Sequence, residues 1–179
     1  MPWRNGLGTT IELLKQDLPD GDGFAWRLSM ADVTTNGVFS NFSGYERTLL
    51  LLEGNGLTLD SNGARHRLEK PLQSARFSGD DQTFATLHDG PVKDFNIMVQ
   101  RQHCSARVSS ALHPDESTLD VDGDILLVYA VDGELSLSGP EIRVPSGHLC
   151  VVQDPANGSL LCRGASHIAV QISYHPSSD

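Results

Sequence analysis

The sequence has little positive charge. It contains 13 lysine and arginine residues and 23 aspartate and glutamate residues, so its formal net charge is −10 over 179 residues. Its basic residues form no long cluster. Nucleic acids and anionic membranes attract proteins through clustered basic side chains. The composition therefore argues against nucleic acid or a membrane as the partner and favours a small molecule or another protein.

Long apolar segments are also missing. No stretch approaches the roughly 18 consecutive apolar residues of a membrane-spanning helix, and the chain does not open on a basic segment followed by an apolar one, as a secretory signal does. We therefore expect a cytoplasmic protein.

Cysteine is scarce. Cys104, Cys150 and Cys162 are odd in number, far apart, and contain no Cys-x-x-Cys pair. A disulfide framework or a structural zinc site needs more ligands at closer spacing. We expect these thiols to be reduced and mostly buried.

Helical periodicity is almost absent, whereas glycine is abundant and short apolar runs recur between turn signals. This pattern is typical of an all-β sandwich or barrel. Residues 48–59 resemble residues 125–137: each segment has an apolar strand, a turn with Asn-Gly or Asp-Gly, and an alternating strand, which predicts a hairpin. The repeat predicts two copies of one barrel, residues 1–103 and 104–179.

The segments that follow each repeat also match. After the first copy we expect strands at 65–68 and 74–77, and after the second copy at 141–144 and 149–152. The correspondence extends the repeat over most of both halves.

Residues 145–147, Pro-Ser-Gly before an apolar strand, resemble the second short motif of cupins, small β-barrels that often carry a metal. Metal-binding cupins place two histidines and a glutamate in their first motif, and a further histidine three residues after the glycine of the second. Here that last position is Cys150, the first half offers only His66 between two arginines, and no His-x-His pair occurs. We expect no protein-bound metal and no other cofactor; phosphate-loop, dinucleotide and Gly-x-Ser-x-Gly signatures are also missing.

The segment 94–100 is unusual because one face of its predicted strand is polar. Side chains alternate faces along a strand. The apolar row holds Phe95, Ile97 and Val99, and the other row holds Asp94, Asn96, Met98 and Gln100. The polar row therefore either faces water or lines a pocket.

A second predicted strand, residues 26–33, also has a polar face opposite an apolar one, and this polar face carries an arginine. Trp26, Leu28 and Met30 share one face, so Arg27 and Ser29 share the other. The planar guanidinium fork holds a carboxylate through two hydrogen bonds.

Arg47 could add a second guanidinium, and Asn96 can both donate and accept, as an amide or formyl group requires. Together with Arg27 they suit a dicarboxylate that carries an amide. In the alternative interpretation, the two arginines pair with acidic neighbours such as Asp32 or Glu46 at the surface or the barrel rim.

The roles of four acidic residues remain open. Asp94 and Asp80 lie near turn residues, where a carboxylate commonly caps backbone amides. Glu12 and Glu53 are candidates for acid/base chemistry only if they are buried.

Several blocks, in the right order, resemble the HutD/Ves family. The matches are strongest over the first hundred residues and continue more weakly through 104–108. The blocks are Pro2–Thr10 (PWRNGLGTT), Trp26–Ala31 (WRLSMA), Gly37–Gly44 (GVFSNFSG), Leu52–Gly54 (LEG) and Asp94–Met98 (DFNIM).

The resemblance implies a bicupin, with two cupin-like β-barrels in one chain. It implies a cytoplasmic bacterial protein linked to histidine utilisation, as in the HutD branch, or to environmental stress, as in the Ves branch. For the HutD branch it implies a ligand such as formylated glutamate, and it carries no established catalytic activity.

The resemblance also implies that the N-terminal segment closes over a pocket mouth, with Trp3 as a wall and Asn5 as a polar contact; Phe42 would supply another wall. Otherwise Trp3 is a hydrophobic anchor for the terminus. The family usually has a glycine run where this chain has residues 6–8, and several residues before Pro-Trp, so a truncated or misassigned start is expected.

Three functions follow from these observations. The leading one is a metal-free bicupin that binds a small carboxylated metabolite and modulates amino-acid catabolism; the others are a lyase, isomerase or hydrolase using Glu12, Asp94 or His66, and a protein-interaction module. Exposed sheet edges are compatible with a homodimer. The expected ligand-binding residues are Trp3, Asn5, Arg27, Ser29, Phe42, Arg47, Asp94 and Asn96.

Overall fold

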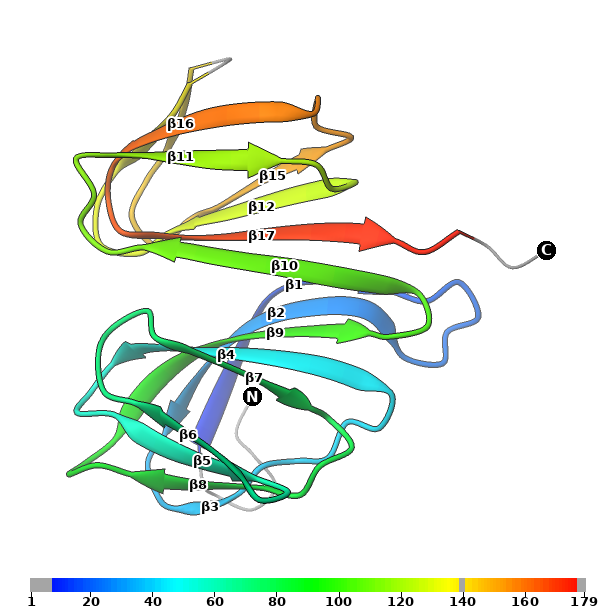
Figure 1. Ribbon diagram of the computed structural model, residues 1–179, viewed down its shortest axis with the longest axis vertical. Coiled ribbons are helices and arrows are strands. Elements are labelled where there is room, and N and C mark those ends of the chain that lie inside the picture. Colours follow the sequence, from blue (N-terminus) through cyan, green and yellow to red (C-terminus); the bar gives the residue numbers. More distant parts are fainter. Residues whose placement is uncertain (1–7, 139–140, 177–179) are drawn as a thin grey trace. The chain divides into compact units, whose positions relative to one another are not determined.

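The computed structural model describes residues 8–138 and 141–176 (Figure 1). All regular secondary structure within these residues is β-strand, as the alternating patterns predict. These residues therefore contain no helix that could cross a membrane. The chain divides into two compact units, Met1–His103 and Cys104–Asp179. Trp3 and Asn5 lie outside the described residues.

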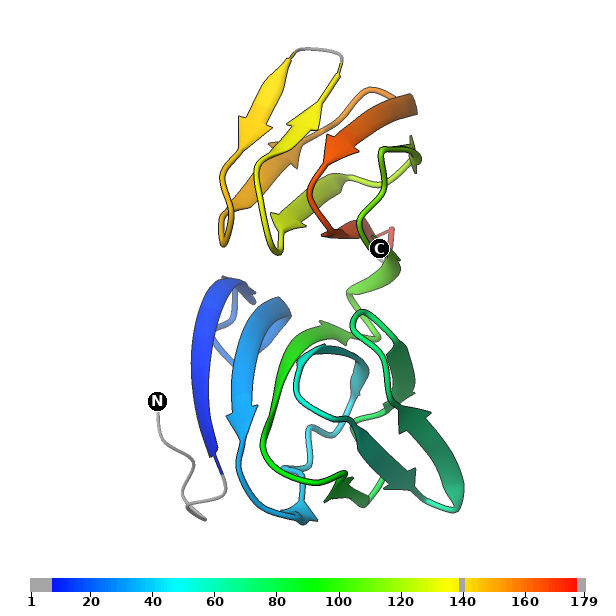
Figure 2. The same ribbon diagram turned by 90° about the vertical axis from the view of Figure 1, so that its left-hand side faces the viewer.

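The N-terminal unit consists of two antiparallel sheets. The larger sheet has the order β1-β2-β9-β4-β7, and Figure 2 shows β1 in dark blue beside β2. Its strands are β1 (Gly8–Asp17), β2 (Phe24–Val33), β9 (Val92–Gln100), β4 (Tyr45–Glu53) and β7 (Ser74–Ser78). The second sheet, in its order, consists of β3 (Gly37–Val38), β8 (Thr83–Leu87), β5 (Leu57–Ser61) and β6 (Ala64–Leu68).

The C-terminal unit repeats this arrangement without a counterpart of β1. One sheet consists, in order, of β10 (Cys104–Ala111), β17 (His167–Tyr174), β12 (Ile125–Ala130) and β15 (Leu149–Gln153). The other consists of β11 (Glu116–Val121), β16 (Gly158–Gly164), β13 (Leu135–Leu137) and β14 (Ile142–Val144). Each unit is thus a pair of sheets with matching topology, which confirms the predicted duplication.

The predicted hairpins at 48–59 and 125–137 are wrong. β4 pairs with β7 and β9, whereas β5 pairs with β6 and β8, so the chain passes from one sheet to the other between β4 and β5. Gly54 and Gly56 allow this change of direction because both have positive φ, +104° and +110°, and a Cβ atom on Gly54 would lie 2.6 Å from the Pro91 carbonyl oxygen. The corresponding strands β12 and β13 also lie in different sheets.

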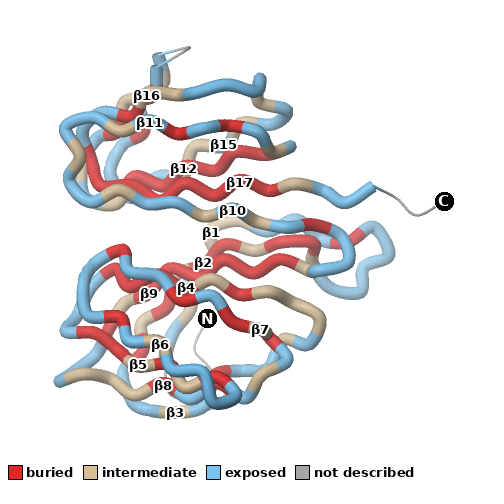
Figure 3. The backbone as a smooth tube through the Cα atoms, viewed as in Figure 1, coloured by how far each residue is buried: buried red, intermediate tan, exposed pale blue. Residues whose placement is uncertain are grey.

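Burial explains why β4 is continuously apolar while β5 alternates. Leu49 and Leu51 point into the core between the two sheets, and Leu50 on the opposite face is only 1% exposed. A strand buried on both faces has an apolar side chain at every position, whereas β5 is fully buried at alternate positions. Figure 3 shows β4 and β9, along with β12 and β17, as long buried stretches.

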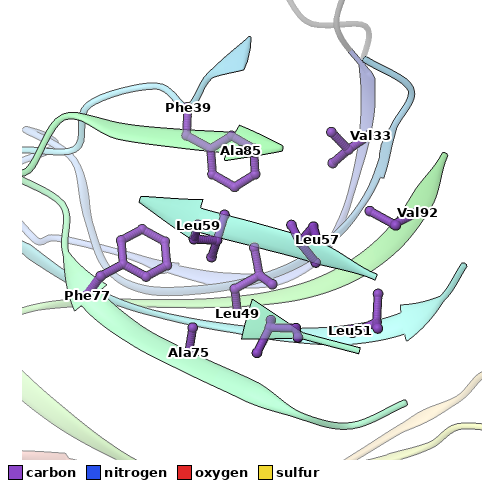
Figure 4. Close-up of a cluster of buried hydrophobic side chains, with 11 residues drawn as sticks. Val33, Phe39, Leu49, Leu51, Leu57, Leu59, Ala75, Phe77, Ala85 and Val92 are labelled. Atoms are coloured by element: carbon purple, nitrogen blue, oxygen red, sulfur yellow. The ribbon is translucent and has the colours of Figure 1, made fainter. Parts of the chain in front are cut away.

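Each unit has its own apolar core. Figure 4 shows the N-terminal cluster, in which Leu49 and Leu51 of β4 meet Leu57 and Leu59 of β5. The C-terminal core is built from the equivalent strands, β12 and β13. The three cysteines are free; Cys104 and Cys162 are buried and Cys150 is half-buried, as expected.

Candidate functional site

The pairing of β2, β9 and β4 gathers the polar side chains predicted for binding. Directly opposite residues on antiparallel strands point to the same face of a sheet. Arg27 is opposite Met98, which is opposite Arg47; in the next inward-facing row, Ser29 is opposite Asn96. The two arginines therefore enter the interior of the N-terminal unit from two strands that flank β9.

Asp94 lies one step further along the same face, opposite Ala31 on β2 and Leu51 on β4. Because Leu51 belongs to the apolar core, Asp94, Asn96 and Met98 of this row face inward and are buried, whereas Gln100 at the end of β9 is only partly buried. Asp94, Asn96 and Ser29 are 0%, 5% and 2% exposed, respectively. The alternative that this row faces solvent is excluded.

Arg47 is a buried cation with few polar partners. It is 5% exposed, its Nη2 donates to Asn96 Oδ1 at 3.2 Å, its Nη1 donates to the Ser40 carbonyl oxygen at 3.2 Å, and its buried Nε has no partner. Burial, together with the charge of Arg27, lowers the pKa of Arg47 to about 10 against the attraction of Asp94. The side chain remains positively charged at neutral pH.

Arg27 is half-buried and similarly short of partners. Its Nη2 lies 3.4 Å from Met98 Sδ, and its buried Nε has no hydrogen-bond partner. Burial lowers the pKa of Arg27, an effect that the Glu12 charge partly offsets. Neither Arg27 nor Arg47 forms an ion pair among the described residues.

The other arginines of the described ranges differ in this respect. All of them form ion pairs: Arg65, Arg67, Arg76, Arg101, Arg107, Arg143 and Arg163. Glu46, the neighbour expected to neutralise Arg47, instead binds Arg76 at 2.6 Å, and Asp32 accepts a hydrogen bond from Thr9. The interpretation of Arg27 and Arg47 as members of surface ion pairs is therefore wrong.

Aromatic rings surround the two guanidinium groups. The rings are those of Phe24, Phe39, Phe42 and Phe77. Phe42 contacts both cations, with its centroid 5.2 Å from Arg27 Cζ and 5.4 Å from Arg47 Cζ. Such rings attract a cation through their faces and strengthen its electrostatic interactions by keeping water away. We call Arg27, Arg47, Asn96, Asp94, Ser29 and these four rings the arginine cluster.

Asp94 is the buried acid of the cluster. Its Oδ1 accepts a hydrogen bond from Asn96 Nδ2, and its Oδ2 is buried without a partner among the described residues. Burial raises the pKa of Asp94 to about 7, opposed by the Arg47 charge and the Asn96 hydrogen bond. Asp94 lies within β9 and not at a turn, and a hydrogen bond with the Ala31 backbone, besides that of the Asn96 side chain, lowers its pKa.

Asp80 does have the capping role. Its Oδ1 accepts hydrogen bonds from Ser43 Oγ at 2.6 Å and from the Gly44 amide at 3.0 Å, and its Oδ2 pairs with Arg101. These hydrogen bonds, led by that of Ser43, hold the pKa of Asp80 well below its usual range. Because Phe42 donates its own amide to the Gly79 carbonyl oxygen, the segment that carries this ring is fixed on both sides.

Replacing Asp80 with asparagine should loosen this segment. The charge-assisted bonds to Ser43, Gly44 and Arg101 would be weakened or lost, so we expect the Gly44 amide to exchange its hydrogen at least about tenfold faster. Hydrogen-exchange NMR measures this rate. Asp60→Asn, which removes the exposed ion pair with Arg65, is the matched control; an equal change in both variants would contradict a bracing role for Asp80.

The remaining candidates lie apart from this chemistry. Glu12 and Glu53 are exposed, and Glu53 pairs with Lys93 at 3.0 Å. His66 is partly buried on β6, opposite Leu59. No group of three or more His, Cys, Asp or Glu side chains within residues 8–138 and 141–176 is placed to hold a metal ion.

The described part of the C-terminal unit contains two hollows. One, of about 170 Å³, has mainly apolar walls that include Val121, Ile142 and Leu160. The other, of about 420 Å³, is lined partly by Glu141 and Arg163, but Arg163 is already bound to Glu116 at 2.8 Å. Neither hollow offers the unpaired cations of the arginine cluster.

Sequence reasoning missed Phe24, Phe39 and Phe77 as members of the site. Each is an ordinary apolar residue whose proximity to a guanidinium depends on strand pairing. The Gly37–Gly44 block, which contains Phe39 and Phe42, was the available signal.

The two-sheet repeat and its inward polar row place the chain in the cupin class. A cupin 2 conserved barrel domain protein from Leptotrichia buccalis superimposes with a TM-score of 0.53 at 12% identity, covering 94% of this chain and 89% of that one. At this identity the likeness shows the fold alone.

The chain belongs to the HutD family, because the HutD family model matches residues 1–170. HutD from Pseudomonas fluorescens SBW25, solved in a formate condition, has a TM-score of 0.85 and 28% identity over 98% of this chain and 94% of its own. An uncharacterized 21.2 kDa protein in the hutC 3' region of Pseudomonas putida is 35% identical, over 80% of this chain and 75% of that protein. Protein Ves of Escherichia fergusonii is 41% identical over 61% of this chain, a match that spans only 57% of the Ves protein.

Proposed function

We propose that the protein binds a small carboxylated metabolite, of the formylglutamate type, at the arginine cluster, and that it modulates histidine or amino-acid catabolism in the cytoplasm. The observation that carries this proposal is the presence of two inward-facing arginines without ion pairs, in a chain whose other described arginines are all paired. A buried cation without a counter-ion is unfavourable for folding. Asp94 attracts Arg47 without forming an ion pair with it, and a ligand carboxylate would supply the direct ion pair that both arginines lack.

The remaining groups fit the rest of such a ligand. A guanidinium fork binds a carboxylate through two parallel hydrogen bonds. In both arginines the Nε–H group has no partner among the described residues and can donate to a ligand. Asn96 uses its oxygen toward Arg47 and one amide hydrogen toward Asp94, which leaves its second amide hydrogen for a ligand carbonyl. The phenylalanine rings would enclose the aliphatic part.

Family membership supports the same choice of ligand. The relative from Pseudomonas putida is named for the hutC region, and the HutD structure was obtained in a formate condition. Formate is the smallest carboxylate and the ion that hydrolysis of a formyl group releases. The relation to proteins named Ves leaves a role in the response to environmental stress as a second setting for the same binding chemistry.

Replacing Arg27 with alanine should weaken carboxylate binding by about 30-fold or more, because one buried charge-assisted contact contributes at least about 2 kcal/mol. Isothermal titration with formylglutamate, formate, glutamate, urocanate, histidine and simple dicarboxylates measures the affinities. Thermal shift gives an independent readout, since a ligand that binds the native state raises its melting temperature.

Arg76→Ala is the matched control for this experiment. Arg76 lies on β7 of the same sheet, but its side chain is 67% exposed and already paired with Glu46. The control should bind as the wild type does. Equal loss in both variants, or no binding of any carboxylate by the wild type, would sink the proposal.

An enzyme is the second candidate, and one observation favours it. A buried carboxyl group whose pKa is raised to about 7, as for Asp94, is suited to general acid/base chemistry at neutral pH. The enzyme would be a lyase, isomerase or hydrolase acting on the same type of metabolite. Incubating the protein with formylglutamate and following the formyl proton by NMR tests for turnover, which Asp94→Asn should abolish.

A further inference from the structure

We infer that the arginine cluster takes up a proton with each carboxylate it binds, and that this proton goes to Asp94. The inference rests on the proposed carboxylate binding and adds a regulatory property to it. It begins from two hydrogen bonds that link the side chains of Arg47, Asn96 and Asp94, so that the Asn96 amide joins a cation to a buried acid.

The amide of Asn96 has a fixed direction in this sequence. Its oxygen accepts from Arg47, so its nitrogen faces Asp94 and donates to Oδ1. Asp94 Oδ2 remains buried with no hydrogen-bond partner in the described ranges. An unpartnered oxygen in this position can hold a proton without breaking any hydrogen bond of the network.

The charges around Asp94 come from all the neighbouring strands. β4 contributes Arg47 and β2 contributes Arg27 and Asp32; β1 contributes Glu12, which is exposed. Lys93 on β9 and Glu53 on β4 pair with each other at 3.0 Å. On the facing sheet, β6 contributes His66 at an inward position opposite Leu59, while the buried positions of β5 and β8 carry no charge: they are apolar apart from Ser61 and Thr83.

In the ligand-free protein, Asp94 is therefore a buried acid whose charge is attracted by the buried Arg47, and Arg47 in turn is repelled by the charge of the half-buried Arg27. A bound carboxylate would place a second negative charge beside the same cations. Two carboxylates that share a site cannot both ionise easily, and one of them takes up a proton. The ligand carboxylate would hold the direct contacts to the guanidinium groups, so Asp94 is the group that becomes neutral.

The consequence is an affinity that depends on pH. Burial already raises the pKa of Asp94 to about 7 without ligand, so near pH 8 the free protein is mostly ionised and uptake approaches one proton per ligand. The affinity should then fall by about tenfold per pH unit above pH 8. Below pH 6, where Asp94 is already protonated, uptake and pH dependence should both be small.

Isothermal titration measures the proton directly. Sodium formate and formylglutamate are titrated into the full chain at pH 8 in HEPES and in Tris, and again near pH 5.5 in MES and in Bis-Tris; the ionisation enthalpies differ within each pair of buffers. At pH 8 the binding heats in the two buffers should differ by nearly the difference between the buffers' ionisation enthalpies, as expected for uptake of one proton. Near pH 5.5 the binding heats should differ little. Asp94→Asn should bind with a heat that is independent of buffer and an affinity that is independent of pH.

Asp32→Asn is the matched control, because Asp32 lies near Asp94 on β2 but is only partly buried. It should retain the uptake. If Asp94→Asn does not fold, the slope of the wild-type affinity against pH gives the same proton number without a variant.

The possible failures differ in kind. Binding heat without any buffer dependence, proton release, or uptake that persists in Asp94→Asn would overturn the inference and leave carboxylate binding standing. No binding heat with any carboxylate at either pH would overturn the proposed function and the inference with it.

Discussion

The Asp94→Asn variant is expected to be more stable than the wild type at pH 8, by about 1 to 4 kcal/mol, and this gain should shrink as the pH falls toward 4. The pKa of Asp94 is raised from 3.8 to about 7 by burial. Between these two values the native state binds a proton that the unfolded chain has released, so the wild type loses stability as the pH rises through this window. Asparagine has nearly the same shape and carries no charge at any pH.

The size of the gain follows from the shift. One pKa unit corresponds to about 1.4 kcal/mol, so a shift of about three units sets an upper limit near 4 kcal/mol. The value of about 7 already includes the attraction of Arg47, which opposes the effect of burial. Urea denaturation at several pH values between 4.5 and 8 measures it, with Asp32→Asn as the control. A gain that is constant across this range, or a loss of stability at pH 8, would show that Asp94 is not a buried acid with a raised pKa.

Much of the fold could be predicted from the sequence because strand patterns are local. The positions of β6, β7, β14 and β15 follow from alternation and turn residues, and Asn62 and Gly63 form the tight turn between β5 and β6 with φ of 46° and 88°. The hairpins at β4–β5 and β12–β13 could not be distinguished locally from a passage between sheets. A turn that contains glycine is compatible with a hairpin and with a passage between sheets. Only the burial of β4 on both faces distinguishes the two arrangements.

The site could be predicted in part for the same reason. The parity of each strand placed Arg27 with Ser29, and Asp94 with Asn96, on one face, and the pairing of β2 with β9 then brought the two faces together. The state of each charge could not be predicted, because it depends on partners far apart in the chain. Glu46 is next to Arg47 in sequence yet points to the opposite face and binds Arg76.

The Arg47→Met variant is expected to lose about 3 kcal/mol of carboxylate binding, roughly 100-fold in affinity, and about 3 kcal/mol of stability at pH 8. Methionine can fill much of the same space and pack against Phe39, Phe42 and Phe77, which surround the guanidinium group. The loss of stability should arise instead from Asp94, whose buried charge would have no cation on β4 to offset it. The loss should therefore be smaller near pH 5, where Asp94 is protonated in the native state.

The double variant Arg47→Met/Asp94→Asn separates these causes. With both charges removed, no buried ion needs a partner, so the double variant should be about as stable as the wild type at pH 8, or more stable, while binding no carboxylate. Urea denaturation of the four proteins gives the coupling energy between the two residues. If Arg47→Met costs the same in both backgrounds, the cost lies in packing or in the contacts of Arg47 with Ser40 and Asn96, and not in the Asp94 charge. A large coupling, together with lost binding, would mean that Arg47 both offsets the buried charge of Asp94 in the free protein and holds the ligand carboxylate.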